Sequence, residues 1–339
     1  MTSPFRMTRR ITRHVHAEPE ARTMWNFPLF PDQASTIAKH VDALYFFALG
    51  IAGFFTAMIC VLILAFAARY RRKSTADRLN PPTASRTLEI IWIGGPMLLM
   101  LTMFTWAAIL FYKMYDPPVD ALEVYVVGKQ WMWHAQHSEG RAEINELHVP
   151  LGRPIRLTMT SQDVIHSFFI PAFRVKQDVL PGRYTTMWFE PAKIGRYHLF
   201  CAEYCGTNHS AMGGWVYVME PVEFQQWLSQ AGTGASMAEQ GERLFVQYHC
   251  AGCHRGSQTV HAPRLEGVYG RPVPVQQGTE VRFTLADYRY IRDSILRPKS
   301  EVVAGYEPVM PSFEGQITEP DLLKIIAYIK SIGAKEATQ

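Results

Sequence analysis

The sequence holds only five cysteines in 339 residues, and four of them fall within two short motifs. This scarcity excludes a fold that is held together by a framework of disulfides, and the clustering instead indicates chemistry at the two motifs. The fifth cysteine, Cys60, lies in a long apolar stretch and is expected to be a passive core or lipid-facing residue.

The N-terminus lacks the pattern of a cleavable leader. Its first 23 residues carry four arginines by Arg13, but no apolar core segment and no small-residue cleavage site, which excludes a secretory signal peptide. Disorder is the expectation for this stretch. Met24 is an alternative start, and translation from it would remove most of this positive charge.

The chain also lacks a strong excess of one charge, since its net charge is only +4. Residues 69–86 hold six Lys/Arg around a single Asp, whereas residues 114–236 hold nine Lys/Arg against twelve Asp/Glu and residues 237–339 hold twelve of each. The basic excess therefore lies beside the apolar segments described next. It fits a membrane topology signal better than a nucleic-acid surface, so no nucleic acid partner is expected.

Two long apolar runs flank this basic segment, at residues 43–68 and 90–112. Each has the ~20 residues that a helix needs to cross a hydrocarbon core. Because short cytoplasmic loops are enriched in Lys/Arg, the loop between the runs is predicted to be cytoplasmic, which places everything after Tyr115 on the outer face. Glu89 lies at the cytoplasmic start of the second run, either as a functional carboxylate or as one that only reaches the headgroups.

From Leu122 the pattern changes to short alternating segments that are separated by glycine and proline turns. This spacing predicts an all-β sandwich or barrel of the Greek-key kind. His166 follows a middle strand of the predicted domain, and the loop that begins at Cys201 and ends at Met212 joins its last two strands.

That loop has the pattern C-x₃-C-x₃-H-x₂-M, formed by Cys201, Cys205, His209 and Met212. Soft thiolate and thioether donors mixed with imidazole select copper over hard cations, and two cysteines on one loop can bridge two metal ions. Zinc or a disulfide would explain the cysteines alone, but zinc sites seldom include methionine. The pattern therefore favours a binuclear copper site that carries one electron.

A second redox motif follows at Cys250-Ala-Gly-Cys253-His254. The C-x-x-C-H spacing attaches a c-type haem covalently, and the adjacent His254 becomes its proximal ligand. The sixth ligand is predicted to be Met310, which lies in a loop stiffened by prolines, because Met/His ligation raises the haem potential. His261 is the alternative.

With these motifs in view, residues 40–220 resemble subunit II of the haem–copper cytochrome c oxidases, and residues 237–335 resemble a class I cytochrome c. The first resemblance rests on residues 88–92, 128–133, 146–150, 161–168, 181–184 and 200–212. It implies a multi-domain membrane protein with an N-terminal extension (1–40), a two-helix transmembrane hairpin (41–114), an all-β cupredoxin-like Greek-key domain (115–225), a linker (226–236) and an all-α cytochrome c domain (237–335).

The resemblance also implies the ligands of two copper ions: His166, Cys201, the backbone carbonyl of Glu203, Cys205, His209 and Met212. The two cysteines would bridge the ions. The Glu203 carboxylate would point to a magnesium ion shared with subunit I. Trp131 would be the exposed aromatic through which electrons enter from a c-type cytochrome, although the residues alone favour a strand aromatic in the core. Glu89 would lie at the mouth of a proton channel in subunit I.

The function implied is that of subunit II of a caa-type cytochrome c oxidase in the bacterial inner membrane, with both redox domains on the outer face. Electrons from a c-type cytochrome or another respiratory donor would pass through haem c and copper to the oxygen-reducing centre of subunit I, coupled to proton pumping. No catalytic residue is expected in this chain. The alternatives are the electron-accepting subunit of a copper-containing nitric oxide reductase and a membrane-tethered carrier without a catalytic partner. Twelve histidines are too few for the catalytic domain of a nitrous oxide reductase.

Overall fold

The computed structural model describes residues 30–76, 85–230, 235–255, 262–277 and 280–334. The expected N-terminal extension is therefore described only from residue 30 onward, and residues 231–234 of the expected linker lie outside the described residues. Met24 and His261 also lie outside them.

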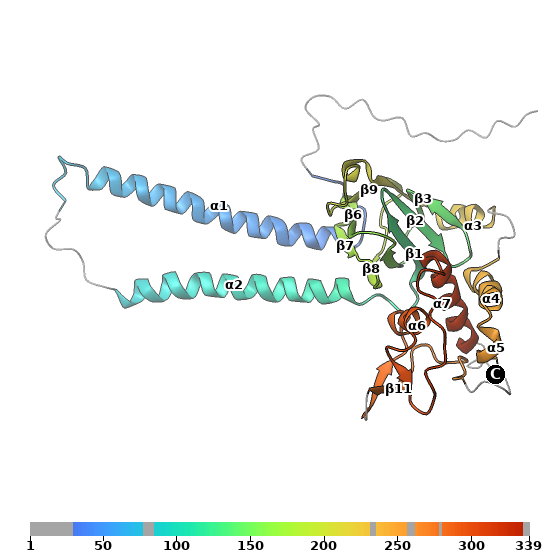
Figure 1. The fold of residues 1–339 in the computed structure, drawn as a ribbon. Helices are drawn as coiled ribbons and strands as arrows, with labels where there is room; N and C mark the ends of the chain where they lie inside the picture. The colour runs from blue at the N-terminus through green and yellow to red at the C-terminus, as the bar shows by residue number, and fades with distance from the viewer. Residues whose placement is uncertain (1–29, 77–84, 231–234, 256–261, 278–279, 335–339) are drawn as a thin grey trace, which may run out of the picture. The chain divides into compact units, whose positions relative to one another are not determined.

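The two apolar runs form long helices, α1 (Ala38–Arg69) and α2 (Arg86–Tyr115) (Figure 1). With 32 and 30 residues, both exceed the length that a membrane-spanning helix needs. The ring centroids of Phe47 on α1 and Trp106 on α2 lie 5.6 Å apart. Most other apolar side chains of the two helices are exposed, as expected for helices that face lipid or another protein.

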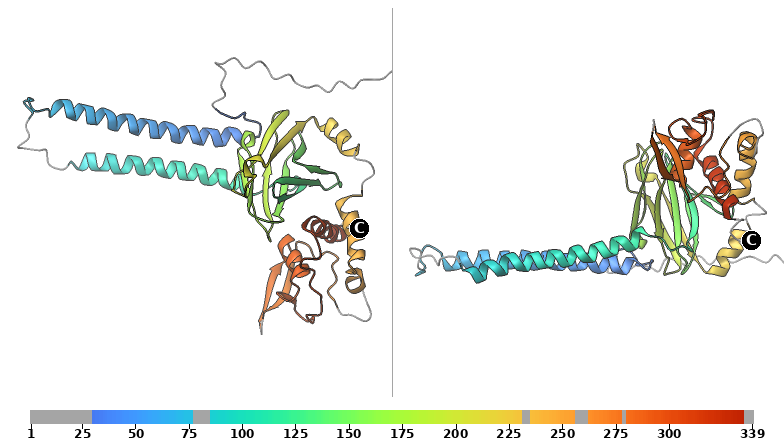
Figure 2. Two further views of the ribbon diagram at one scale, coloured as in Figure 1. Left: turned by 45° about the horizontal axis from the view of Figure 1, so that its top comes forward. Right: turned by 90° about the horizontal axis from the view of Figure 1, so that it is seen from below.

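Ten strands form a sandwich of two mixed five-stranded sheets (Figure 2). The first sheet has the order β3-β2-β1-β5-β8 and the second the order β4-β10-β9-β6-β7. Each sheet contains one parallel pair, β1 with β5 and β4 with β10. The strands are β1 (Leu122–Lys129), β2 (Met132–His137), β3 (Ala142–Ile144), β4 (Glu146–Pro150), β5 (Ile155–Ser161), β6 (His166–Ile170), β7 (Val175–Val179), β8 (Thr185–Phe189), β9 (Gly195–Cys201) and β10 (Gly213–Met219).

The core of the sandwich lies between the two sheets and follows the period-two alternation of the strands. In β9, Tyr197, Leu199 and Cys201 are buried, whereas the residues between them are exposed. Trp133 and Phe168 are buried on opposite sheets, with ring centroids 4.9 Å apart. Because Cys201 ends a strand of this core, the sheet fixes the position of its sulfur.

A short helix, α3 (Pro221–Ser229), follows the last strand of the sandwich. It includes residues 226–229, which the sequence reading assigned to the linker. Phe224 of α3 is buried, so the helix packs against the β-domain rather than extending from it.

The C-terminal domain is helical, as expected, with α4 (Met237–Gln247), α5 (Ala251–His254), α6 (Tyr288–Leu296) and α7 (Glu319–Ala334). It also contains a three-stranded sheet that the sequence did not predict, with β11 (Pro272–Gln277), β12 (Glu280–Leu285) and β13 (Val302–Val303). A capping box begins α4, since Ser236 Oγ accepts the Glu239 N–H (3.2 Å) and Glu239 accepts the Ser236 N–H (2.8 Å). Gly241 lets α4 approach α7, because a Cβ there would lie 1.9 Å from the Lys324 carbonyl oxygen.

A buried carboxylate ties three strands of the sandwich together. Glu143 on β3 accepts from His137 Nε2 on β2 (2.8 Å), from the His148 backbone N–H on β4 (3.1 Å) and from His148 Nδ1. Burial alone would raise the pKa of Glu143, but these hydrogen bonds outweigh burial and lower it to about 2.

We expect Glu143→Gln to lower the free energy of unfolding of the β-domain by about 2 kcal/mol at pH 7, because charge-assisted hydrogen bonds to a buried carboxylate are lost. Since the pKa is depressed in the folded state, this stabilisation is present above the ordinary pKa of 4.5 and is lost as the pH falls towards 2. Urea unfolding at several pH values measures both effects. Glu139→Gln is the control, because Glu139 is exposed in the turn that precedes β3. An equal loss in both variants would contradict the prediction.

Candidate redox sites

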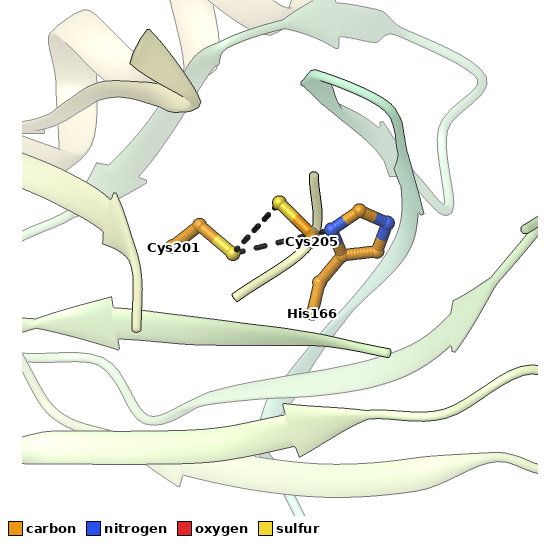
Figure 3. A group of neighbouring side chains, drawn as sticks. All are labelled: His166, Cys201 and Cys205. Atoms are coloured by element: carbon orange, nitrogen blue, oxygen red, sulfur yellow. Dashed lines mark hydrogen bonds between the residues drawn. The ribbon is translucent and has the colours of Figure 1, made fainter. Parts of the chain in front are cut away.

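The copper motif folds into one cluster at the ends of the strands. His166 begins β6, Cys201 ends β9, and the loop to β10 carries Cys205, His209 and Met212. Cys201 Sγ lies 3.8 Å from Cys205 Sγ and 3.9 Å from His166 Nδ1 (Figure 3). Cys205 Sγ lies 3.5 Å from His209 Nδ1 and 3.7 Å from Met212 Sδ. The structure therefore brings both thiols, both imidazoles and the thioether together.

Four of the five side chains are shielded from water, since His166, Met212, Cys205 and Cys201 are 0%, 1%, 3% and 8% exposed, whereas His209 is partly exposed. A sulfur–sulfur distance of 3.8 Å excludes a disulfide, whose bond length is about 2.05 Å. The atoms of His166, Cys201 and Cys205 that can bind a metal all lie within 4.8 Å of one another. Soft sulfur donors that converge in a dry pocket fit copper, and the residues present fit the expected pair of ions.

The two thiols differ in acidity. Burial opposes ionisation of Cys201, but its contact with the His166 imidazole and with backbone groups outweighs burial and lowers its pKa. Burial and the neighbouring Cys201 both raise the pKa of Cys205. Metal binding by both sulfurs must therefore displace the proton of Cys205.

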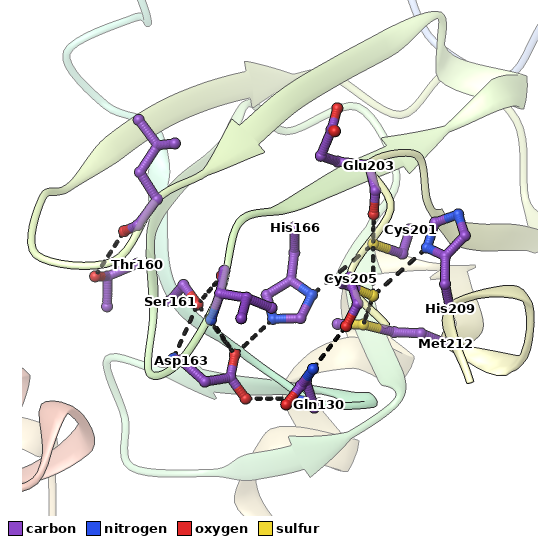
Figure 4. A network of polar contacts seen from close by, with 12 residues as sticks. Gln130, Thr160, Ser161, Asp163, His166, Cys201, Glu203, Cys205, His209 and Met212 are labelled. Carbon is purple, nitrogen blue, oxygen red and sulfur yellow. Dashed lines mark hydrogen bonds and ion pairs between the residues drawn. The ribbon is translucent and has the colours of Figure 1, made fainter. Parts of the chain in front are cut away.

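The backbone carbonyl and the side-chain carboxylate of Glu203 point in different directions (Figure 4). Its backbone carbonyl oxygen lies 3.3 Å from Cys201 Sγ, as expected for a ligand of the cluster. Its carboxylate is exposed and points away from the thiols, where another subunit could reach it.

Two polar residues that the sequence reading did not single out hold the cluster in place. Asp163 Oδ1 lies 2.8 Å from His166 Nε2, which leaves Nδ1 to face Cys201. Gln130 donates its backbone N–H to Asp163 (2.7 Å) and its side-chain Nε2–H to the carbonyl oxygen of Cys205 (2.7 Å). In the sequence, the only indication of this role is that Gln130 precedes Trp131 and Asp163 lies three residues before His166.

Trp131 follows Gln130 in the turn between β1 and β2. It is partly buried and packs against the core of the sandwich, so it is less exposed than the resemblance implies. A Cβ on Gly206, in the copper loop, would lie 3.4 Å from the Trp131 ring. The indole N–H has no hydrogen-bond partner among the described residues. The ring therefore lies directly beside the loop that carries the thiols.

The haem motif lies at the start of the C-terminal domain. The His254 backbone N–H donates to the Cys250 carbonyl (3.0 Å), which closes a helical turn that holds both cysteines. His254 Nδ1 lies 2.8 Å from the Pro263 carbonyl oxygen, which can only accept, so Nδ1 carries the proton and Nε2 is left to bind iron. Cys250 and Met310 both pack against the hydrophobic core of this domain, and the role of Met310 as the sixth ligand stays a prediction.

Glu89 lies in the first turn of α2 and is exposed. Ser85 caps this helix through its hydroxyl, which accepts from the Leu88 N–H (3.4 Å). The carboxylate thus lies at the N-terminal end of the helix.

Three family models match the chain. The model described as cytochrome c oxidase subunit II, transmembrane domain, matches residues 22–108, and the model of its periplasmic domain matches residues 142–219. The cytochrome c model matches residues 238–333.

Several known proteins are similar to the chain. Cytochrome c oxidase subunit 2 of Alkalihalophilus pseudofirmus is 28% identical over 82% of this chain and 85% of the relative. Haem–copper oxidase subunit 2 of Aeropyrum pernix is 34% identical over 45% of this chain and 69% of the relative. The crystal structure of the periplasmic domain of subunit II of cytochrome oxidase from Bradyrhizobium japonicum is 34% identical, covers 34% of this chain and 96% of that chain, and has a TM-score of 0.33.

Proposed function

Because the chain belongs to the cytochrome c oxidase subunit II family and carries a C-terminal cytochrome c domain, we propose that it is subunit II of a caa-type oxidase. As an oxidase subunit it is anchored in a membrane and partners the other subunits of its complex. In the proposed complex, electrons from a c-type cytochrome or another respiratory donor reach haem c, then the copper pair, then the oxygen-reducing centre of subunit I, coupled to proton pumping.

One observation carries this proposal: a cluster of two thiols, two imidazoles and a thioether, buried except for the partly exposed His209, lies in the same chain as a Cys-x-x-Cys-His turn. A copper pair supplies one-electron chemistry when it is bound there. The chain's own residues shield the cluster from water and hold it between rigid strands, which limits the rearrangement that accompanies a change in charge.

The proposed ligand roles follow the contacts. Cys201 and Cys205 would be shared ligands of the two copper ions, and His166, the carbonyl of Glu203, His209 and Met212 would be the remaining ligands. Asp163 orients the His166 ring. The exposed Glu203 carboxylate would take part in a magnesium site shared with subunit I.

The remaining roles are proposed from position. Cys250 and Cys253 hold the haem covalently, and His254 and Met310 bind its iron. Trp131 lies beside the copper loop, where its ring would form part of the path of electrons into the copper site. Glu89, at the start of a transmembrane helix, would feed protons to subunit I. The basic loop between α1 and α2 favours the bacterial inner membrane with both redox domains on the outer face.

Whether the complex consumes oxygen or nitric oxide tests the proposal. We expect the purified membrane complex that contains this chain to consume oxygen when reduced cytochrome c is the donor. Oxygen and nitric oxide electrodes on the same sample separate the two enzyme classes. Turnover of nitric oxide with no uptake of oxygen would move the chain to the nitric oxide reductase branch and reject the oxidase.

A further inference from the structure

The haem domain follows the β-domain through a connector between α3 and α4. The turn between β2 and β3, residues 138–141, contacts the chain at both ends of this connector, at Trp227 of α3 and at Met237 of α4. We propose that this turn is a docking site for the two ends of the connector, so that the haem domain is held in place by contacts and not by a free tether. The inference rests on the proposed electron path, because it concerns how haem c is kept beside the copper domain.

The first end of the connector is held through Trp227 of α3. The Arg141 guanidinium carbon lies 3.7 Å from the centroid of the Trp227 ring, and Arg141 Nη1–H donates to the Trp227 carbonyl. His148 stacks on the same ring, with centroids 4.4 Å apart and planes 21° apart. His137 meets it edge-on at 5.4 Å. α3 is therefore fixed on the surface that the turn and its neighbouring strands form.

The surface under Trp227 is itself rigid. The buried Glu143 carboxylate binds the rings of both His137 and His148, and its side chain is only 5% exposed. Tyr217 stacks on the other face of His148, with centroids 4.5 Å apart. Trp227 therefore rests on rings whose orientation is set by buried hydrogen bonds and by packing.

The second end of the connector is held at Ser138 and Gly140. The Met237 N–H at the start of α4 donates to the Ser138 carbonyl (3.1 Å), and Met237 is buried. A Cβ on Gly140 would lie 2.3 Å from the Ala235 carbonyl oxygen, so glycine permits a close backbone contact there. Ser138 Oγ–H donates to the Glu123 carbonyl (3.0 Å), which anchors the turn on β1.

The same strand β1 also binds the haem domain directly. The Glu123 carboxylate accepts from Lys330 Nζ (2.6 Å) and from Tyr288 Oη (2.9 Å). The Tyr125 and Tyr288 hydroxyls lie 2.8 Å apart. Burial would raise the pKa of Glu123, but the Lys330 ammonium outweighs it and keeps the pKa lowered, so the carboxylate is charged at neutral pH. The docking surface thus continues from the turn along β1.

These contacts make a prediction that separates docking from tethering. The connector is the five residues 230–234, between the end of α3 and the contact at Ala235. For a free tether, lengthening it by about twelve Gly/Ser residues should lower the rate of electron transfer from haem c to copper by roughly sixfold, since effective concentration falls as about the −3/2 power of length. For docked ends, we expect the same insertion between Thr233 and Gly234 to change that rate by less than about twofold.

A pair of glycine variants supplies the matched test. Gly140→Ala and Gly152→Ala both place a methyl group at positive φ (+96° and +67°) in turns of the β-domain, but only the first meets Ala235, whereas nothing lies within 4 Å of the second. In the purified oxidase complex we expect Gly140→Ala to raise the rate of proteolysis of the connector by about tenfold, and Gly152→Ala to leave it unchanged. Arg141→Gln, which adds no backbone strain, should raise it as well.

Rapid-mixing kinetics of haem c and copper absorbance, together with gel analysis of the cleaved connector, measure both effects. Two results would overturn the docking inference. The first is equal proteolysis in the two glycine variants together with no effect of Arg141→Gln. The second is a roughly sixfold lower rate of electron transfer from haem c to copper in the insertion variant than in wild type. If copper is never reduced by haem c in any variant, the proposed electron path fails instead, and the proteolysis pattern still decides the docking.

Discussion

Replacing Cys205 with serine is expected to remove copper from the chain and to leave haem c in place. A hydroxyl is a harder and less acidic donor than a thiol, so it cannot replace a sulfur that contacts Cys201, His209 and Met212 at 3.5–3.8 Å. We expect copper affinity to fall by at least about a hundredfold, because half of the sulfur bridge is lost. Oxygen uptake by the complex should fall with it.

Metal analysis and haem absorbance of the same purified complex measure this result. Wild type should hold two more copper ions for each haem c than Cys205→Ser. Cys60→Ser is the matched control, since Cys60 is exposed on α1 and lies in neither motif, and it should keep both metals. Retention of both copper ions in Cys205→Ser would show that this sulfur does not bridge them.

Replacing His254 with alanine should give the opposite pattern, loss of stable haem c with copper retained. The hydrogen bond from Nδ1 to Pro263 holds the ring so that Nε2 is available to iron, and alanine removes both the ligand and its anchor. We expect electron transfer from the external donor to fall by at least about a hundredfold, because the donor loses its first acceptor.

His249→Asn is the control in this domain. His249 is exposed five residues upstream at φ +61°, a conformation that asparagine tolerates. A pyridine haemochrome spectrum and the donor oxidation rate, both measured on the purified complex, should match wild type in this variant. Normal haem content in His254→Ala would reject His254 as the proximal ligand.

The motifs were predictable from sequence because their ligand residues stand close together in the chain, at spacings that metal or haem binding requires. Cys201, Cys205, His209 and Met212 share one loop, so the set could be recognised before any fold was known, and the structure brings them together with His166 from another strand. The two apolar runs were equally plain, because ~20 apolar residues have few other structures to adopt.

Other features depend on contacts between distant residues, and the local sequence does not encode them. The parallel pairing of β1 with β5 joins segments that are about thirty residues apart, and β3 has only three residues. Asp163 and Gln130 became visible as supports of the copper cluster only when the strands placed them beside His166 and Cys205. The extension of α3 into the expected linker likewise follows from the packing of Phe224 and Trp227, because nothing in their local pattern distinguishes a docked helix from a linker.

The central claim is that copper lies between haem c and oxygen, and oxygen uptake by the purified complex with Met212→Leu tests it most directly. Leucine keeps the volume of the buried side chain but removes the sulfur that lies 3.7 Å from Cys205 Sγ. With reduced cytochrome c as donor and haem c absorbance recorded together with oxygen, the account predicts that haem c is reduced as in wild type while oxygen uptake collapses. Unchanged oxygen uptake in Met212→Leu, with copper lost from the cluster, would show that electrons reach oxygen without this centre and would contradict the account.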